Sequence, residues 1–205
     1  MSMFSSEEKA RVSEAIGRAE RKTAGEIVVV VAAASDDYLF VPVLAGAFAG
    51  LLVPWLLIFF TPLGLAAIYL IQLCVFLGVS LAAMPRRVRT ALAPKPIKRL
   101  RARRHAVEQF LAQNLHTTSQ HTGVLIFVSV AERQVEIVAD AEIDRRVAAG
   151  TWQAIVDDLT AALAKGEAAD GLIAAVAAVG AHLAQHFPPE TRNHNELPDH
   201  FIVLQ

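Results

Sequence analysis

Acidic residues stand at the ends of the short apolar runs that the sequence predicts to be strands. Glu26 opens the run EIVVVV, and Asp140 and Glu142 follow the run 135–139. If the strand at Glu26 is parallel to the next one, 124–130, and the third runs back beside the second, Asp140 ends near Glu26. Carboxylate oxygens at such an edge could bind a hard cation such as Ca²⁺ or Mg²⁺, although solvated strand ends carry the same residue types. We therefore expect Asp140 and Glu26 to form a candidate site for Ca²⁺ or Mg²⁺. The sequence makes no cofactor certain.

Other reactive groups are few. The chain has one cysteine, Cys74, which lies in an uncharged apolar block, so we expect neither an internal disulfide nor a cysteine metal site. The sequence has no Walker-type phosphate loop, dinucleotide-binding glycine fingerprint or nucleophile elbow. His182 and His186 have the spacing of two-histidine zinc sites, but the glutamate base of such enzymes is missing between them. Catalytic residues stay unknown, and the sequence leaves open whether the protein is an enzyme.

A basic segment is the most interpretable polar feature. From Arg86 to Arg104 there are nine lysines and arginines and no acid, whereas from His105 onward there are five basic and thirteen acidic residues. Five basic side chains are expected to face anionic lipid head groups, namely Lys98, Arg99, Arg101, Arg103 and Arg104. A plain topology signal has the same composition, and the two interpretations are compatible. Nucleic-acid binding is not expected, because the remaining domain is acidic and carries no binding motif.

An uncharged apolar block of 46 residues runs from Leu39 to Met84. One crossing of a bilayer core needs about 20 apolar residues, so the block predicts two spans. These are Leu39–Phe60 and Leu63–Met84, separated at Thr61-Pro62 because proline removes a backbone donor. A very hydrophobic soluble core is the alternative.

The charges beside this block predict its orientation. The basic segment follows the second span directly, which places it in the cytoplasm by the positive-inside rule. Two spans return the chain to the side from which it started, so residues 1–38 are expected there too. We therefore predict a two-span membrane protein with both termini and its soluble domain in the cytoplasm.

Helix and strand signals outside the apolar block alternate. A capping box at Ser5-Ser6-Glu7-Glu8 begins a helix, and a second helix is predicted from Ile97, with Val107, Phe110, Leu111 and Leu115 on one apolar face. Two more helices follow the third strand, and His200–Leu204 could form an edge strand. This order predicts the α/β class, as a three-layer α/β/α sandwich with a small mixed sheet that a transmembrane hairpin interrupts. The expected parts are residues 1–38 (first helix and strand), 39–84 (hairpin), 85–104 (basic juxtamembrane segment) and 97–205 (the remainder of the domain).

Short motifs spread over the soluble part resemble a known family, the TPM domain. The matching segments are Thr23-Ala24-Gly25-Glu26-Ile27-Val28-Val29, Thr122-Gly123-Val124-Leu125-Ile126-Phe127-Val128-Ser129, Glu132-Arg133-Gln134-Val135-Glu136-Ile137, Trp152-Gln153-Ala154-Ile155-Val156, Asp170-Gly171-Leu172, His186-Phe187-Pro188 and Asn195-Glu196-Leu197-Pro198. Their order and spacing, rather than any single motif, carry the resemblance. It is nearest to a bacterial membrane subgroup in which two transmembrane spans are inserted in the domain, which implies that the membrane is the bacterial inner membrane.

The resemblance implies an α/β/α module and several possible roles. Members of the family have been linked to divalent-cation binding, to phosphatase activity in plant representatives, and to the assembly or repair of membrane complexes. We expect a non-enzymatic docking or assembly module that contacts membrane lipids, and a membrane protein complex is a further possible partner. A divalent-metal-dependent phosphatase-like hydrolase is the alternative.

Overall fold

A computed structural model describes residues 4–118, 121–189 and 201–204, which form two compact units. One unit comprises Met1–Ser35 with Arg99–Gln205, and the other is Asp36–Lys98. The predicted turn at 195–199 and His200 lie outside the described residues. The elements, in chain order, are α1 (Ser6–Glu20), β1 (Glu26–Ala32), α2 (Phe40–Phe60), α3 (Leu65–Ala82), α4 (Arg86–Leu92), α5 (Lys95–Ala112), the 3₁₀ turn η1 (Leu115–Thr117), β2 (Gly123–Ser129), β3 (Gln134–Ala139), α6 (Ala141–Arg146), α7 (Thr151–Lys165), α8 (Ala168–His186) and β4 (Phe201–Leu204).

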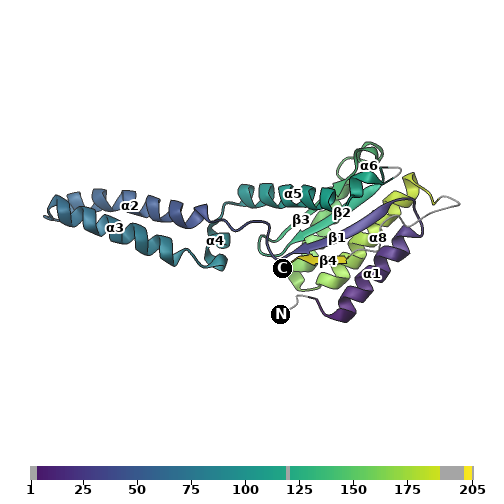
Figure 1. Ribbon diagram of the computed structural model, residues 1–205, viewed down its shortest axis with the longest axis horizontal. Coiled ribbons are helices and arrows are strands. Elements are labelled where there is room, and N and C mark those ends of the chain that lie inside the picture. The colour runs from purple at the N-terminus through teal and green to yellow at the C-terminus, as the bar shows by residue number, and fades with distance from the viewer. Residues whose placement is uncertain (1–3, 119–120, 190–200, 205) are drawn as a thin grey trace. The chain divides into compact units, whose positions relative to one another are not determined.

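The first unit is built on a four-stranded mixed sheet in the order β3-β2-β1-β4 (Figure 1). β1 is parallel to both β2 and β4, and β2 is antiparallel to β3. The parallel pair and the antiparallel hairpin confirm the predicted arrangement, and β4 takes the predicted edge position. Because β1 lies between two strands and two layers, its apolar run is buried along its whole length.

Helices cover both faces of this sheet, which confirms the three-layer sandwich. Alternate β1 residues such as Ile27 and Val29 pack with α1, α7 and α8 on one face. Their neighbours Val28 and Val30 pack on the other face against α5 and Leu115. In Figure 1, α5 lies on one side of the sheet, and α1 and α8 lie on the other. One face therefore has a three-helix cover, while the other is covered mainly by α5.

The entry into α1 follows the predicted capping box. The Ser5 hydroxyl accepts a hydrogen bond from the Glu8 backbone N–H at 3.1 Å, and the Glu8 carboxylate accepts one from the Ser5 N–H at 2.8 Å. The Ser5 backbone N–H, followed by the Ser5 side chain, holds the pKa of Glu8 below its usual 4.5. The helix then buries Val12 and Ile16 against the sheet.

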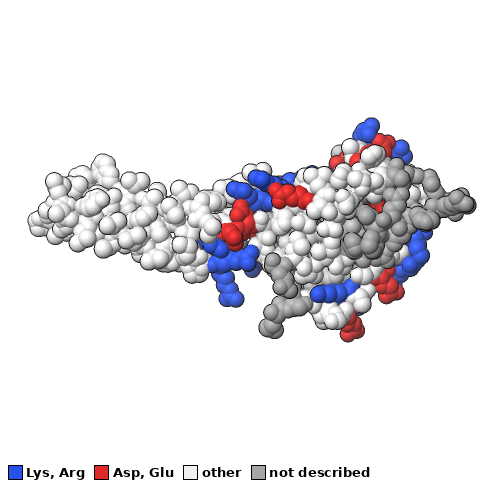
Figure 2. All heavy atoms as spheres, in the orientation of Figure 1, with Lys and Arg blue, Asp and Glu red and all other residues white. Residues whose placement is uncertain are grey.

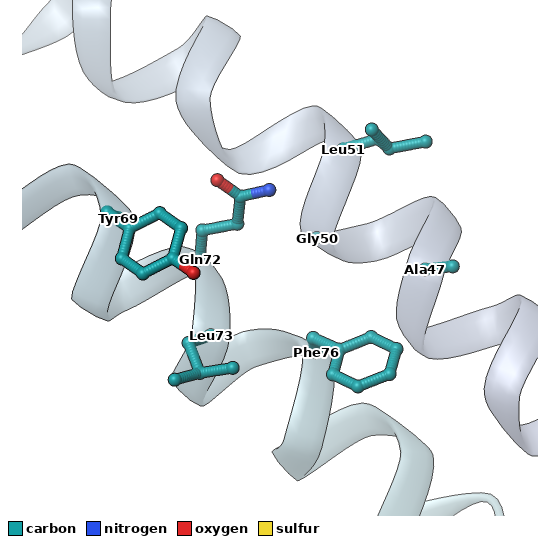
Figure 3. Close-up of a pocket in the computed structure, with 7 residues that line it drawn as sticks. All are labelled: Ala47, Gly50, Leu51, Tyr69, Gln72, Leu73 and Phe76. Atoms are coloured by element: carbon teal, nitrogen blue, oxygen red, sulfur yellow. The ribbon is translucent and has the colours of Figure 1, made fainter.

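The second unit contains the helical hairpin α2–α3 followed by the short helix α4. The two predicted spans are confirmed as helices, separated by the break at residues 61–64. At Gly46 the helices approach so closely that an added Cβ would lie 2.6 Å from the Phe76 carbonyl oxygen. Further along, Ala47, Gly50, Gln72 and other residues line a groove of about 310 Å³ (Figure 3). No carboxylate, histidine or thiol lines it, so it offers no group for acid–base chemistry at neutral pH.

By length and composition, three helices in the described residues could cross a membrane. These are α2 and α3, with hydropathies of 2.4 and 2.3, and α8, with 1.3. In α8, 44% of the apolar window is buried within the protein, compared with 11% in α2 and 6% in α3. The apolar side of α8 is thus explained by the domain core, whereas the apolar surfaces of α2 and α3 are left largely exposed.

Three details differ from the sequence expectations. α5 begins at Lys95 rather than Ile97, because a proline in the first helical turn costs no internal hydrogen bond. α4 and α6 are additional short helices. The apolar face of α5 also differs: Ala102, Ala106 and Phe110 are its buried residues, whereas Val107 and Leu111 are exposed.

Candidate functional site

The sheet register brings the predicted carboxylates to one end of the sheet. Glu26 pairs with Gly123 across β1 and β2. On the other side of Gly123, the Asp140 backbone N–H donates to the Gly123 carbonyl at 3.0 Å. Glu26 and Asp140 therefore flank Gly123, as the predicted strand directions require. We call this end, with Glu26, Gly123 and Asp140, the carboxylate edge.

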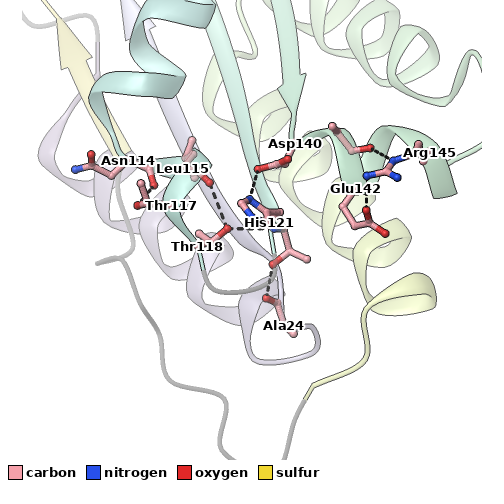
Figure 4. A network of polar contacts seen from close by, with 11 residues as sticks. Ala24, Asn114, Leu115, Thr117, Thr118, His121, Asp140, Glu142 and Arg145 are labelled. Carbon is pink, nitrogen blue, oxygen red and sulfur yellow. Dashed lines mark hydrogen bonds and ion pairs between the residues drawn. The ribbon is translucent and has the colours of Figure 1, made fainter.

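Threonine hydroxyls organise the loops at the carboxylate edge. The Thr122 hydroxyl donates to the Ala24 carbonyl at 2.9 Å, and the Thr122 N–H donates to the Thr118 hydroxyl at 3.1 Å. Figure 4 shows these contacts beside His121, whose Nδ1 lies 3.5 Å from Asp140 Oδ2. His121 has a φ of 53°, a left-handed conformation that directs the chain through this turn. Sequence reasoning missed Thr118 and His121, because neither forms a recognisable local motif.

A third carboxylate reaches the same end from α1. Glu20 is only 7% exposed, and its Oε1 accepts a hydrogen bond from the Ile27 N–H at 2.8 Å. By accepting this hydrogen bond, Glu20 fixes the start of β1, a structural role that its position near a predicted helix end did not indicate.

Asp140 differs, because it stands at the N-cap of α6 without accepting a capping hydrogen bond. Its carboxylate is therefore not committed to its own helix.

The spacing at the carboxylate edge limits what it could bind. Two strand spacings of about 4.8 Å put the Cα atoms of Glu26 and Asp140 about 10 Å apart. An added Cβ at Gly123 would lie 2.5 Å from the Leu115 carbonyl oxygen, so the backbone of Leu115 closely covers the space over Gly123. In the described part of the chain, no three His, Cys, Asp or Glu side chains are grouped to hold a metal ion. The carboxylates do not by themselves fit a complete Ca²⁺ ligand set, and the metal site stays a prediction.

The five predicted lipid-facing basic residues have different surroundings in α5. Arg99 and Arg104 are exposed, while Lys98 and Arg101 are partly buried. The Arg104 Nε lies 3.0 Å from Glu108 Oε1 one turn further on. Arg103 instead reaches the edge strand, where its Nη1 donates to the Ile137 carbonyl at 2.9 Å and lies 3.6 Å from Glu136 Oε2. Arg103 is thus tied to the sheet, Arg104 is paired within α5, and Arg99 is exposed.

The ion pair on β3 also involves a perturbed acid. Burial raises the pKa of Glu136 above its usual 4.5, and Arg103 followed by Arg99 partly oppose this shift. Glu136 lies in the middle of the strand rather than at the carboxylate edge. It is a structural acid that connects α5 to the sheet.

The opposite end of the sheet holds a second polar cluster that sequence reasoning missed. The Glu132 carboxylate accepts hydrogen bonds from the Ser129 hydroxyl and from the Ser35 N–H, the latter at 3.0 Å. The Ser35 hydroxyl donates to the Ser129 hydroxyl at 2.8 Å. Ser129 is 0% exposed and Glu132 is 5% exposed, so no substrate reaches them. We call these three residues the serine–glutamate cluster, and it fixes the chain where it leaves β1.

Comparisons with known proteins agree with this architecture. The family model described as TPM domain matches residues 93–182, which contain β2, β3 and α7. The solved NMR structure of the BA42 protein from the psychrophilic bacterium Bizionia argentinensis is similar, with a TM-score of 0.62 and 18% sequence identity over 98% of this chain and 94% of that one. No curated protein matches the chain. With its mixed sheet and covering helices, the chain carries a TPM domain, which the family model matches over residues 93–182.

Proposed function

We propose that this protein is a membrane-anchored TPM domain of the bacterial inner membrane that acts as a non-enzymatic docking or assembly module. Its anchor is the α2–α3 hairpin, whose exposed apolar surface has no explanation in a soluble unit. This proposal extends to the bacterial membrane subgroup of the family, with two spans inserted between β1 and α5. A membrane protein complex is the partner that such a module would assist.

The observation that carries this proposal is the abrupt change from no charge to dense positive charge. Residues 39–84 have no charged side chain, and nine basic residues follow from Arg86 to Arg104. Figure 2 shows Lys and Arg side chains over α4 and along α5, and none on the visible face of α2 and α3. Basic residues at a span end favour the cytoplasmic side and bind anionic lipids with about 1 kcal/mol per residue. Both termini and the TPM domain are accordingly proposed to be cytoplasmic.

Lipid docking can be tested on the full chain in nanodiscs of neutral and of anionic lipids. Replacing Lys98, Arg99, Arg101 and Arg104 with glutamine should remove most of the protection from amide exchange that anionic lipid gives to α5, because these residues supply its charge. Arg103 is left in place because it binds the sheet. The matched control changes Lys9, Arg18, Arg21 and Lys22 to glutamine, which removes the same charge from α1 and its C-terminal end.

The two sets of variants give opposite expectations. The control variant should keep the lipid-dependent protection of α5, since its changes lie on another helix. Equal protection of the α5 variant and the parent in anionic nanodiscs would reject lipid docking. The basic segment would then serve only as a topology signal.

A divalent-metal-dependent phosphatase-like hydrolase is the second candidate function. The observation that favours it is the meeting of Glu26 and Asp140 at one sheet edge, with Asp140 not used as a helix cap. The test is a titration of the full chain with Ca²⁺ and with Mg²⁺, followed by its melting temperature and by turnover of a generic phosphate ester. A metal-dependent rise in melting temperature that Asp140→Ala abolishes would support a metal site. Turnover lost in the same folded variant would support the enzyme, whereas no shift at millimolar metal would reject both.

A further inference from the structure

The outer face of α5 carries large apolar side chains that the domain core does not use. Leu100 is 68% exposed, Val107 is 37% exposed and Leu111 is 50% exposed. Together with Arg104 they are spaced four, three and four residues apart, which places all four on one face of a helix. The opposite face contains the buried residues Ala102, Ala106 and Phe110. We call Leu100, Val107 and Leu111 the outer apolar stripe.

The charges around the stripe indicate what could cover it. Arg104 lies within it, 69% exposed at the side chain. At about 100° per residue, Arg101 and Arg103 lie on either side of the stripe. Arg99 lies toward the buried face, near enough to act on Glu136. Glu108 is the acid on this face, and it is paired with Arg104. An apolar stripe bordered by arginines is the pattern of helices that lie in the interface of an anionic bilayer. The arginine stems can lie along the apolar zone while their guanidinium groups reach lipid phosphates.

The covalent connection keeps α5 close to the proposed membrane. Twelve residues, 83–94, separate the end of α3 from the start of α5, and seven of them form α4. At about 1.5 Å per helical residue and about 3.5 Å per extended residue, this linker spans at most about 28 Å. A soluble partner that covered the stripe would have to compete with a bilayer that is always within this distance.

We infer that α5 lies in the plane of the anionic membrane surface, with Leu100, Val107 and Leu111 inserted at the level of the acyl chains. This inference rests on the proposed membrane anchoring and makes the docking contact more specific. The basic side chains would bind phosphate groups, and the outer apolar stripe would hold the domain against the bilayer. The TPM domain would then present the opposite face, with α1, α7 and α8, to other proteins.

Spin labels on the full chain in nanodiscs test the insertion. In a Cys74→Ser background, single Leu100→Cys and Leu111→Cys variants are labelled, with Thr160→Cys on the exposed side of α7 as the control. The two α5 labels should be severalfold more accessible to oxygen than to a water-soluble nickel chelate, relative to the Thr160 label. Both α5 positions are exposed, and unchanged melting temperatures will show that the substitutions leave the fold intact.

The outcomes separate the inference from the proposed function. If the two α5 labels are no more accessible to oxygen than the Thr160 label is, while the protection of α5 still depends on charge, insertion would be overturned and lipid docking would stand. Inserted labels in neutral and anionic nanodiscs alike would support insertion and reject the role of charge in docking. Spin–spin broadening at Leu111 that grows with the number of chains per disc would overturn the inference, because the stripe would then be a contact between copies.

Discussion

The two ends of the sheet hold carboxylates in opposite situations. At the carboxyl end of β1 and β2, Glu132 is 5% exposed and accepts hydrogen bonds from Ser129 and Ser35. At the carboxylate edge, the Asp140 side chain is 14% exposed and its described contact is a 3.5 Å approach to His121. Burial of an acid is therefore no sign of function by itself. What distinguishes the two acids is how fully hydrogen-bond donors surround them.

This comparison predicts that Glu132→Ala is the most damaging of the changes considered. It leaves the Ser35 N–H and the Ser129 hydroxyl buried without their acceptor, which should cost about 3 kcal/mol in the free energy of unfolding. Glu14→Ala is the matched control, because Glu14 is an exposed acid whose pair with Arg18 is worth less than about 0.5 kcal/mol. Denaturation of the purified full chain in detergent measures both. Similar losses in the two variants would contradict the structural role of the serine–glutamate cluster.

The carboxylate edge can be disturbed without touching a carboxylate. Gly123→Ala places a Cβ 2.5 Å from the Leu115 carbonyl, so η1 must shift, at a cost of about 2 kcal/mol. Gly78→Ala is the control, because an added Cβ there meets nothing within 4 Å. Melting temperatures compare the two variants. If Gly123→Ala leaves the melting temperature unchanged, the loop at the carboxylate edge is more flexible than its threonine hydrogen bonds indicate. The carboxylate edge and the serine–glutamate cluster would then differ even more in rigidity.

Glu136, between the two ends, should give the smallest effect and a pH signature. Burial raises its pKa in the folded protein above the usual 4.5, so the unfolded chain loses its proton first as the pH rises. The stabilising contribution of the protonated form is therefore complete below pH 4.5 and is lost as the pH rises through the folded pKa. Glu136→Gln should remove this decline. The difference in unfolding free energy should be less than about 1 kcal/mol, because Arg103 partly compensates for the burial of Glu136.

The measurement is the unfolding free energy of the parent and Glu136→Gln across the acidic range. Adding Arg103→Gln to the parent should steepen its decline, because Arg103 lowers the pKa of Glu136. Parallel pH curves for the parent and Glu136→Gln would show that this acid is as well hydrated as an ordinary surface glutamate.

Much of the fold followed from local patterns in the sequence. The uncharged block and its proline break predicted the helical hairpin, because each half has the length and composition of a helix that could cross a membrane. The β-branched run after Gly25 predicted a strand buried on both faces. The strand directions then placed Asp140 at the same edge as Glu26, since a strand of fixed polarity must end at a known side of the sheet.

Tertiary structure alone decided which side of α5 is buried and how β1 ends. Val107 and Leu111 fit a helical apolar face with Phe110, but the sheet accepts the narrower face of Ala102 and Ala106, where α5 can approach closely. The serine–glutamate cluster joins residues 94 and 97 positions apart, and no local pattern records such a contact. Local sequence patterns determined the apolar hairpin and the order of the helices and strands, because these features depend on residues that are neighbours in the chain. Side-chain partners depended on the packing of distant segments, and only the folded structure brings them together.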